Sequence, residues 1–266
     1  MKKPLYGQTI YYQDELNDDF ANTSINAEKI TSDYRYFIQN PFARLGSFLL
    51  LYLIAIPIIN LMNWFRFGIR VHGRPHLRGI RTGYILYGNH THHYDAFIPQ
   101  AIIARPRKTY IIAHPDAVSI PFVKYLTKGL GAWPLPDTVK GTMRFLEAIE
   151  RALKQKRVIA VYPEAHIWPY YTKIRPYKAT SFQYAARNLV PAVPMVTTFR
   201  RPKGCLKAYR KPLMDIHIGV PIYPDPTLTV KENAAMLHER TLAFMNEYAS
   251  RPDNVAFYEY VKKNAD

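Results

Sequence analysis

The sequence predicts an α/β protein in which a largely parallel mixed sheet is covered by helices, preceded by an N-terminal membrane-associating helical segment. Two observations lead to this prediction. Apolar strand-like runs alternate with helix-like segments from residue 82 onward, and a stretch of 21 residues without a formal charge lies between Arg44 and Arg66. We divide the chain into a polar N-terminal extension (1–40), an apolar membrane-anchoring helical segment (41–70) and a large α/β domain (71–266).

The apolar segment allows three arrangements. Its uncharged stretch has about the length that crosses a hydrocarbon core, but Pro57, Asn60 and Asn63 interrupt its second half. Trp64 and the arginines that follow resemble an interfacial aromatic with headgroup-binding cations. These arginines are Arg66, Arg70, Arg74, Arg78 and Arg81. The pattern favours a bent, monotopic anchor over a full membrane span or a buried core helix.

The predicted sheet starts with two apolar runs. TGYILYG (82–88) has the composition of a buried strand, and a short helix (96–104) follows it. KTYIIAH (108–114) is the next strand. The helix after it (120–129) ends at glycines, which are frequent at helix ends.

The same alternation continues to the end of the domain. The segment 138–155 is a helix because its apolar residues share one helical face. It is followed by a strand (157–164), a helix (179–188), a strand (190–199), an alternating strand (213–222) and an amphipathic helix (230–249). Ligands of such sheets bind at the carboxyl ends of the strands. We therefore expect the polar clusters 89–95 and 163–166, which follow two strands, to form the site.

Charge and cysteine usage narrow the classes of partner. The chain has a formal net charge of +16, and residues 1–40 are acidic overall, so the rest of the chain is strongly basic. Such a body favours anionic partners: nucleic acid, an acidic lipid surface or phosphorylated small molecules. No nucleic-acid motif is present, so a non-enzymatic basic binder remains the weaker reading and we expect no nucleic-acid partner. The single cysteine, Cys205, is interpreted as a spectator thiol and excludes an internal disulfide.

The most reactive stretch is YGNHTHHYDAF (87–97), which crowds three histidines and one aspartate together. A metal site would resemble the His-x-His-x-Asp-His cluster of zinc hydrolases of the metallo-β-lactamase type. Here Asp95 comes one residue late and Ala96 replaces the last histidine, so we expect no metal. A metal-dependent hydrolase that uses the histidine cluster stays as an alternative, and a polar loop without function is the third reading.

A proton-transfer pair needs only His90 and Asp95. Five residues of a regular helix would turn the two side chains away from each other. They can meet if His90 lies in the turn after the strand and Asp95 lies in the first turn of the next helix. Asp95 would then accept the Nδ1 proton of His90 and leave Nε2 to take a proton from a substrate.

An ordered set of motifs then resembles the glycerolipid acyltransferases, whose best-known members acylate lysophosphatidic acid. Asn89, His90 and Asp95 match the family's Asn-His-x-x-x-x-Asp block. YPE at 162–164 begins like its Phe-Pro-Glu-Gly-Thr-Arg block, GAWPLPD (131–137) stands between these blocks, and VPAVPMV (190–196) resembles its last apolar strand. The blocks occur in family order across residues 82–200.

The resemblance implies an enzyme that moves a fatty acyl chain from acyl-CoA or acyl carrier protein, as co-substrate, to a hydroxyl of a lysophospholipid-type acceptor. It implies His90 as the general base, Asp95 as its orienting partner, and no cofactor. Residues 71–266 are then the acyltransferase domain, at the cytoplasmic face of a membrane. The predicted substrate-binding residues are Asn89, Glu164, His166, Lys173, Arg175 and Lys178.

Two departures from the family concern the acceptor. Asp137 and Ile167 stand about where the family has two arginines that hold the acceptor's phosphate. The predicted replacement cations are Lys173, Arg175 and Lys178, among which bidentate recognition favours Arg175. The alternative is an acceptor without that phosphate, such as an amino-acid lipid. The basic stretch 199–212 is predicted to face the acyl donor or the membrane.

Overall fold

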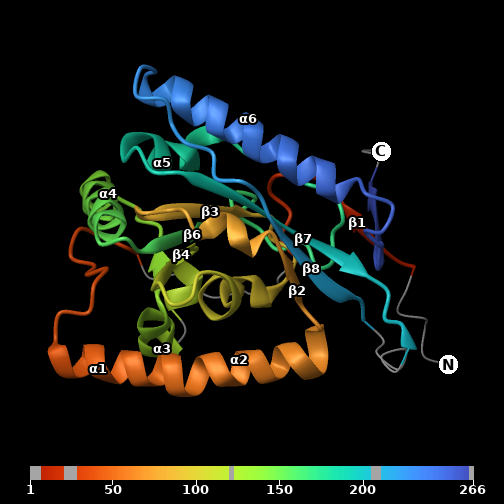
Figure 1. Ribbon diagram of the computed structural model, residues 1–266, viewed down its shortest axis with the longest axis horizontal. Helices are drawn as coiled ribbons and strands as arrows, with labels where there is room; N and C mark the ends of the chain where they lie inside the picture. Colours follow the sequence, from red (N-terminus) through yellow and green to blue (C-terminus); the bar gives the residue numbers. More distant parts are fainter. Residues whose placement is uncertain (1–6, 21–28, 120–122, 205–210, 264–266) are drawn as a thin grey trace.

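The computed structural model describes residues 7–20, 29–119, 123–204 and 211–263 (Figure 1). Its main sheet has seven strands in the order β2-β8-β7-β3-β6-β4-β5. These strands are β2 (Arg70–His72), β3 (Tyr84–Gly88), β4 (Thr109–Ala113), β5 (Ala132–Pro134), β6 (Val158–Val161), β7 (Ala192–Arg200) and β8 (Leu213–Ile218). The predicted α/β class and mixed sheet are confirmed. Three-residue β2 and β5 were not predicted, because such short segments carry no recognisable periodicity.

The register of the central strands decides where the site lies. β3 pairs in parallel with both β6 and β7, and Tyr87 lies opposite Val161. The polar loops after β3 and β6 therefore leave the sheet at the same edge. β8 runs antiparallel to β7 and carries β2 in parallel on its other side. Below, the edge at the carboxyl ends of β3 and β6 is called the catalytic edge.

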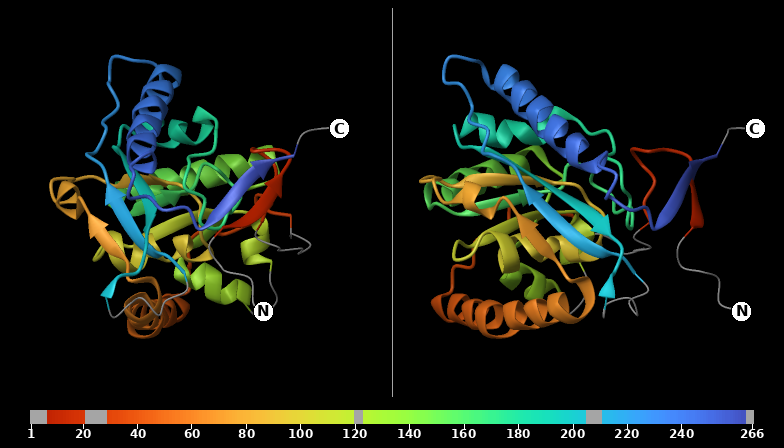
Figure 2. Two further views of the ribbon diagram at one scale, coloured as in Figure 1. Left: turned by 90° about the vertical axis from the view of Figure 1, so that its right-hand side faces the viewer. Right: turned by 45° about the vertical axis from the view of Figure 1, so that its right-hand side comes forward.

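Helices cover both faces of the sheet (Figures 1 and 2). One face carries α4 (Val139–Lys154), η7 (Ala179–Phe182), α5 (Gln183–Arg187) and α6 (Val230–Ala249). The core on this side joins Ile85 and Ile159 of the sheet to Phe145, Ile149 and Phe182 of the helices. The other face carries η3 (Arg74–Leu77), η5 (Pro99–Ile103), η6 (Pro115–Val118) and α3 (Val123–Leu130). Two predicted segments lie partly outside the described residues. They are the helix 120–129, at residues 120–122, and the basic stretch 199–212, at residues 205–210, which include Cys205.

The apolar segment forms one 27-residue helix, Pro41–Phe67, which is long and apolar enough to cross a membrane by length and composition. It consists of α1 (Pro41–Leu49), η1 (Leu50–Ala55), α2 (Ile56–Met62) and η2 (Asn63–Phe67). The π-helical turns of η1 come directly before Pro57, and the helix runs through this proline without a break. The proline, at which the sequence predicted a bend, thus lies within one continuous helix.

The long helix lies along the α/β domain and does not project from it (Figure 1). Leu51 and Ile56 are buried against Ala101 of η5, and Ser47 Oγ donates to the Gly129 carbonyl at 2.6 Å. The helix presents a broad apolar surface on its other side. Its exposed large apolar side chains are Phe42, Leu45, Phe48, Leu49, Leu53, Ile54, Ile58, Leu61, Trp64 and Phe65. We call these residues the apolar face.

A second, two-stranded sheet joins segments that are far apart in the sequence (Figure 2). β1 (Gln8–Tyr12) pairs in parallel with β9 (Tyr258–Lys262). Residues 7–20 include β1 and run past the loop that follows β6, and we call them the N-terminal strap. The sequence predicts only a polar extension here, because nothing in the local pattern of these residues indicates a partner some 250 residues later.

Candidate active site

His90 and Asp95 meet at the catalytic edge. His90 lies in the turn after β3, and Asp95 lies in the single 3-10 turn η4 (His93–Ala96). His90 Nδ1 is 3.1 Å from Asp95 Oδ2, as the sequence led us to expect. The imidazole is 16% exposed, whereas Asp95 is buried. The pair thus occupies Nδ1 and leaves Nε2 as the ring nitrogen for a substrate.

Backbone donors fix the Asp95 carboxylate. Its Oδ2 accepts the N–H groups of Thr91 and His92, at 2.7 and 2.8 Å, in addition to facing His90. Tyr162 supports both members of the pair: its ring stacks on His90 with centroids 4.8 Å apart, and its hydroxyl donates to the Asp95 carbonyl. An imidazole held on one nitrogen and one ring face has a restricted orientation, which a general base requires.

Asn89 was predicted to contact the substrate, but its side chain is buried and bonds the backbone of β7 instead. It is 2% exposed, and both polar atoms of its amide bond the backbone of β7. Nδ2 donates to the Thr197 carbonyl at 3.0 Å and Oδ1 accepts the Thr197 N–H at 2.8 Å. The side chain replaces a peptide group where β3 ends beside β7, and it anchors the start of the His90 turn.

The loop after β6 is bonded to the same turn. Trp168 N–H donates to the His90 carbonyl at 3.1 Å, and Tyr170 N–H donates to the Thr91 carbonyl at 3.0 Å. Trp168 is fully buried. Two segments that are 78 to 79 residues apart are thereby held in fixed register beside the imidazole. Only the fold brings these two loops together, so their contacts could not be read from the sequence.

Glu164 and Arg175 form a buried ion pair behind His90. Glu164 Oε2 accepts the His90 N–H at 3.1 Å and lies 3.4 Å from Arg175 Nη2. Each side chain is 1% exposed. Burial raises the pKa of the Glu164 carboxyl, although the Arg175 charge and the His90 N–H act in the opposite direction. The pair supports the catalytic turn from within the protein.

This burial corrects the predicted role of Arg175 as a phosphate-binding cation. Its guanidinium donates to the backbone carbonyls of Glu164, His166 and Glu15, and it lies over the Trp168 ring at 5.0 Å. In the sequence, Arg175 follows the third motif closely and looks like a cation available to a substrate. In the structure it is buried against the Glu164 carboxylate and is not available. The other predicted cations, Lys173 and Lys178, are exposed. His166 is half-buried, and its Nδ1 lies 3.8 Å from Asp19.

The N-terminal strap packs against the Glu164–Arg175 loop from outside. Trp168 Nε1 donates to the Asp18 carbonyl at 2.8 Å, and Phe20 packs edge-on against the Trp168 ring. Tyr171 Oη donates to Glu15 at 3.1 Å. The strap thus encloses Arg175 and completes the burial of the ion pair. Neither the strap nor the role of Trp168 is predicted by a local sequence pattern.

His92 has a structural role. Its Nδ1 accepts the Tyr94 N–H at 3.1 Å and so caps η4, while its ring packs against Phe67 and Tyr170. Burial lowers the pKa of His92 to about 4. The folded protein therefore favours the neutral form of the His92 side chain, because only the neutral imidazole can accept this hydrogen bond.

Acid should accordingly destabilise the protein through His92. Because its folded pKa lies below the ordinary 6.5, its stabilising contribution is complete above pH 6.5 and is lost as pH falls toward about 4. The full effect is of the order of 3 kcal/mol. His92→Asn keeps an N-cap acceptor without the titration. Urea unfolding between pH 7 and 4 should show a shallower pH dependence for this variant, and an unchanged slope would contradict the assignment.

Ala165 has a backbone conformation that favours glycine, with φ of 63°. It stands where the resembling family has the glycine of its Phe-Pro-Glu-Gly-Thr-Arg block. Left-handed backbone costs a residue with a Cβ about 1–2 kcal/mol, partly offset by the greater freedom of glycine in the unfolded chain. Ala165→Gly should therefore raise the free energy of unfolding by up to about 1 kcal/mol. Chemical denaturation measures this change, and a loss of stability would refute the argument.

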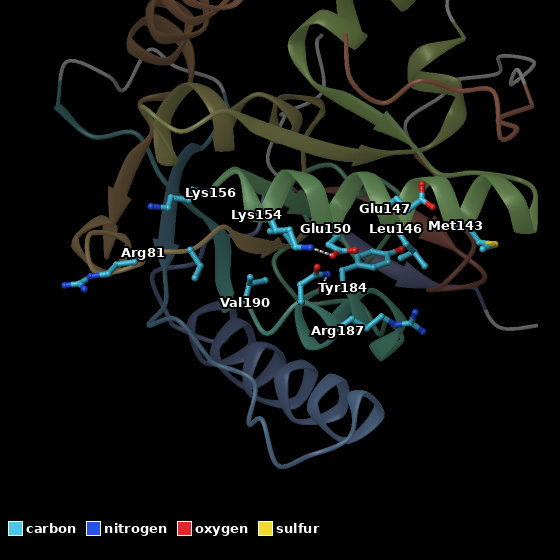
Figure 3. A pocket seen from close by; sticks show the side chains of 13 residues that line it. Arg81, Met143, Leu146, Glu147, Glu150, Lys154, Lys156, Tyr184, Arg187 and Val190 are labelled. Atoms are coloured by element: carbon cyan, nitrogen blue, oxygen red, sulfur yellow. Dashed lines mark hydrogen bonds and ion pairs between the residues drawn. The ribbon is translucent and has the colours of Figure 1, made fainter. Parts of the chain in front are cut away.

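A large open cavity of about 750 Å³ lies away from this site (Figure 3). Its walls include Arg81, Lys156 and Val190, which precede β3, β6 and β7, so it lies at the edge opposite His90. Lys154 pairs there with Glu150 at 2.5 Å. In the part of the chain that the structure describes, no group of three or more His, Cys, Asp or Glu side chains is placed to hold a metal ion.

Comparison with known proteins connects this α/β sheet and its His90–Asp95 pair to the acyltransferases. Residues 68–198 match the family model described as Acyltransferase. The fold is also similar to the crystal structure of the 1-acyl-sn-glycerophosphate (LPA) acyltransferase PlsC from Thermotoga maritima. That similarity has a TM-score of 0.54 at 19% sequence identity and covers 79% of this chain and 88% of the other. No curated protein sequence matches the chain.

Just under half of the chain thus matches the Acyltransferase model, and the fold over most of the chain is similar to that of a glycerophosphate acyltransferase. The match supports an acyltransferase domain, and the matched region begins directly after the long apolar helix. The matched region contains His90, Asp95, Glu164 and Arg175 but not the N-terminal strap.

Proposed function

We propose that the protein transfers a fatty acyl chain from a thioester donor, acyl-CoA or acyl carrier protein, to a hydroxyl of a lysophospholipid-type acceptor. The observation that supports this most directly is the 3.1 Å contact between His90 Nδ1 and the buried Asp95 carboxylate. It directs Nε2 toward a substrate and fixes the tautomer in which Nε2 accepts a proton.

In this mechanism His90 Nε2 removes the proton of the acceptor hydroxyl as its oxygen attacks the thioester carbonyl carbon. The tetrahedral intermediate collapses by breaking the carbon–sulfur bond. The imidazolium returns the proton to the departing thiolate, so the products are the acylated acceptor and the free thiol. Asp95 stabilises the imidazolium that forms between the two steps. Glu164, Arg175 and Tyr162 position the imidazole and do not exchange protons with substrate.

The class of acceptor depends on which charged side chains of the protein can contact its headgroup. Arg175 is committed to Glu164, so a phosphate on the acceptor would have to use other cations, such as the exposed Lys173 and Lys178. The burial of Arg175 favours a second candidate, an acceptor without that phosphate monoester, such as an amino-acid lipid. Asp19 beside His166 would then suit a cationic headgroup.

A lipid-acceptor screen tests the proposal. Purified full-length protein is incubated with radiolabelled acyl-CoA or acyl carrier protein and with lysophosphatidic acid, larger lysophospholipids or a monoacyl amino-acid lipid, and products are identified by mass. We expect one diacyl product, formed equally well with or without a chelator. Thioester hydrolysis that stops when a chelator is added, with no acyl product, would instead indicate the metal-dependent hydrolase.

We further propose that the long helix is a monotopic anchor at the cytoplasmic face of a membrane. One side of the helix packs on the domain and the other carries the apolar face, an arrangement that suits a helix lying in the interface plane. Replacing Phe48, Leu53 and Trp64 together with serine should move the protein from the vesicle pellet to the supernatant in sedimentation. Serine at Val139, Met143 and Val220, which are exposed elsewhere, is the control. Equal partitioning of both variants would refute the anchor.

A further inference from the structure

Three exposed arginines surround two adjoining cavities where the long helix meets the domain. One cavity, of about 420 Å³, is lined by Arg74, Arg105 and Pro106 together with Asn60 of the helix. The other, of about 390 Å³, shares Arg74, Arg105 and Pro106 and adds Arg78 and Arg107. We call these two cavities the arginine cleft.

The cleft lies away from the catalytic edge. η3, which carries Arg74, precedes β3, and the Arg105–Pro106 segment precedes β4, so both belong to the opposite edge of the sheet. Tyr52 of the helix donates to the Pro106 carbonyl at 3.4 Å. The cleft is therefore bounded by the helix on one side and by the domain on the other.

The charge of the cleft is not compensated within the described residues. No Asp or Glu is among the side chains that line the two cavities, and the sequence has no acidic residue between Asp33 and Asp95. Arg107 is bound to the carbonyls of Thr82 and Ile80 and so belongs to the structure of the wall. Arg74, Arg78 and Arg105 are exposed, and no ion pair in the described parts of the chain includes them.

The chemistry of the cleft selects an anion with several acceptor oxygens. Three guanidinium groups repel each other unless an anion lies between them, and their planar donor forks match the oxygens of a phosphate. Asn60 adds a neutral amide, on the same helix that carries the apolar face. A ligand that contacts both the arginine side chains and the apolar face has a phosphate headgroup and acyl chains.

We propose that the arginine cleft is a binding site for the phosphate headgroup of an anionic glycerophospholipid, separate from the catalytic site. The apolar face inserts among the acyl chains, and the cleft flanks the helix on the side of the domain, where headgroups lie. The bound lipid is a structural part of the membrane and fixes how the domain sits on it. Binding is independent of His90.

Vesicle binding by the full-length protein tests this site. Flotation is measured with vesicles of phosphatidylcholine alone and of phosphatidylcholine mixed with phosphatidylglycerol. One arginine near an anionic surface contributes about fivefold to binding, so Arg74→Gln, Arg78→Gln and Arg105→Gln together should reduce affinity for the mixed vesicles by about 100-fold. Affinity for phosphatidylcholine alone should change little.

The corresponding triple lysine variant separates a built site from diffuse attraction. It keeps all three charges but loses the bidentate fork, so we expect it to bind the mixed vesicles less tightly than wild type. Binding equal to wild type would overturn the proposal. The charge-matched control is Lys140→Gln, Lys231→Gln and Arg240→Gln on exposed positions of α4 and α6. A loss in this control as large as in the cleft variant would also overturn the site.

Two further measurements complete the test. Acyl transfer to an acceptor dispersed in detergent should be unchanged in the cleft variants. This comparison of variant with wild type does not depend on which lipid is the acceptor. A titration with inorganic phosphate and with glycerol phosphate examines the alternative source of the anion. If either soluble anion binds wild type as tightly as the lipid does, the ligand is a soluble phosphate compound and the lipid proposal fails. Should the triple variants not fold, Arg105→Gln and Arg105→Lys alone carry the same comparison, with about fivefold expected for glutamine.

Discussion

Replacing His90 with alanine is expected to lower the rate of acyl transfer by about 10²–10⁴-fold, which is the range for loss of a general base. The protein should remain folded, because the structural bonds of this residue come from its backbone. Its N–H donates to Glu164 and its carbonyl accepts from Trp168. Alanine keeps both groups, and Asp95 keeps the N–H groups of Thr91 and His92.

The measurement is single-turnover acyl transfer by the purified variant, alongside its thermal unfolding curve. His93→Ala is the matched control, since His93 is exposed in the same turn and should leave the rate close to wild type. Asp95→Asn should also lower the rate, because an amide cannot stabilise the imidazolium as a carboxylate does. If the His90 variant retains substantial turnover, another group removes the proton and the mechanism above is wrong.

Replacing Arg175 with methionine is expected to destabilise the protein by about 3–5 kcal/mol, the usual cost of leaving one member of a buried ion pair uncompensated. The guanidinium also satisfies three backbone carbonyls, which methionine cannot do. Glu164→Gln removes the other charge and should destabilise as well. Combining both changes removes both charges, so the double variant should be more stable than the sum of the single effects predicts.

Urea unfolding of the four proteins in this cycle measures the coupling. Arg144→Met is the control, because Arg144 pairs with Glu147 at 3.1 Å on the surface and its loss should cost less than about 1 kcal/mol. If Arg175→Met and Arg144→Met lower the free energy of unfolding by similar amounts, the buried ion pair stabilises the protein no more than a surface pair does.

The pH dependence of the Arg175→Met variant gives a second signature. Burial already raises the pKa of Glu164, and loss of the guanidinium removes the largest opposing influence. The folded variant then holds the proton more tightly than the unfolded chain, so its stability should fall as pH rises above the ordinary carboxyl value of 4.5. Activity should also fall through kcat more than through KM, because Glu164 bonds the backbone of the base and not the substrate.

The sequence predicted the elements whose patterns are local. Continuous apolar runs predicted β3, β4, β6 and β7, and the amphipathic spacing predicted α4 and α6 close to their observed bounds. The turn geometry required for His90 to reach Asp95 could be worked out from a strand followed by a helical turn. The catalytic role of this pair remains a prediction for the kinetic experiment above.

The remaining features depend on contacts that no local pattern contains. Arg175 and Lys173 look equivalent as cations in the sequence, yet one is buried against Glu164 and the other is exposed. Asn89 carries a family motif position, and only the pairing of β3 with β7 shows that its amide bonds the Thr197 backbone. The strap acts on the site through Trp168, a contact between segments about 150 residues apart.

The pairing of β1 with β9 bears on the order in which the enzyme becomes active during its synthesis. β1 is translated before the α/β domain, whereas its partner strand, Tyr258–Lys262, is translated after the other strands of that domain. Until then the strap has no sheet to hold it over Trp168 and Arg175. A nascent chain that already contains His90, Asp95 and Glu164 would therefore still have an unsupported catalytic loop. Acyl transfer should begin only once β9 has been made, well after the long helix has had the opportunity to reach a membrane.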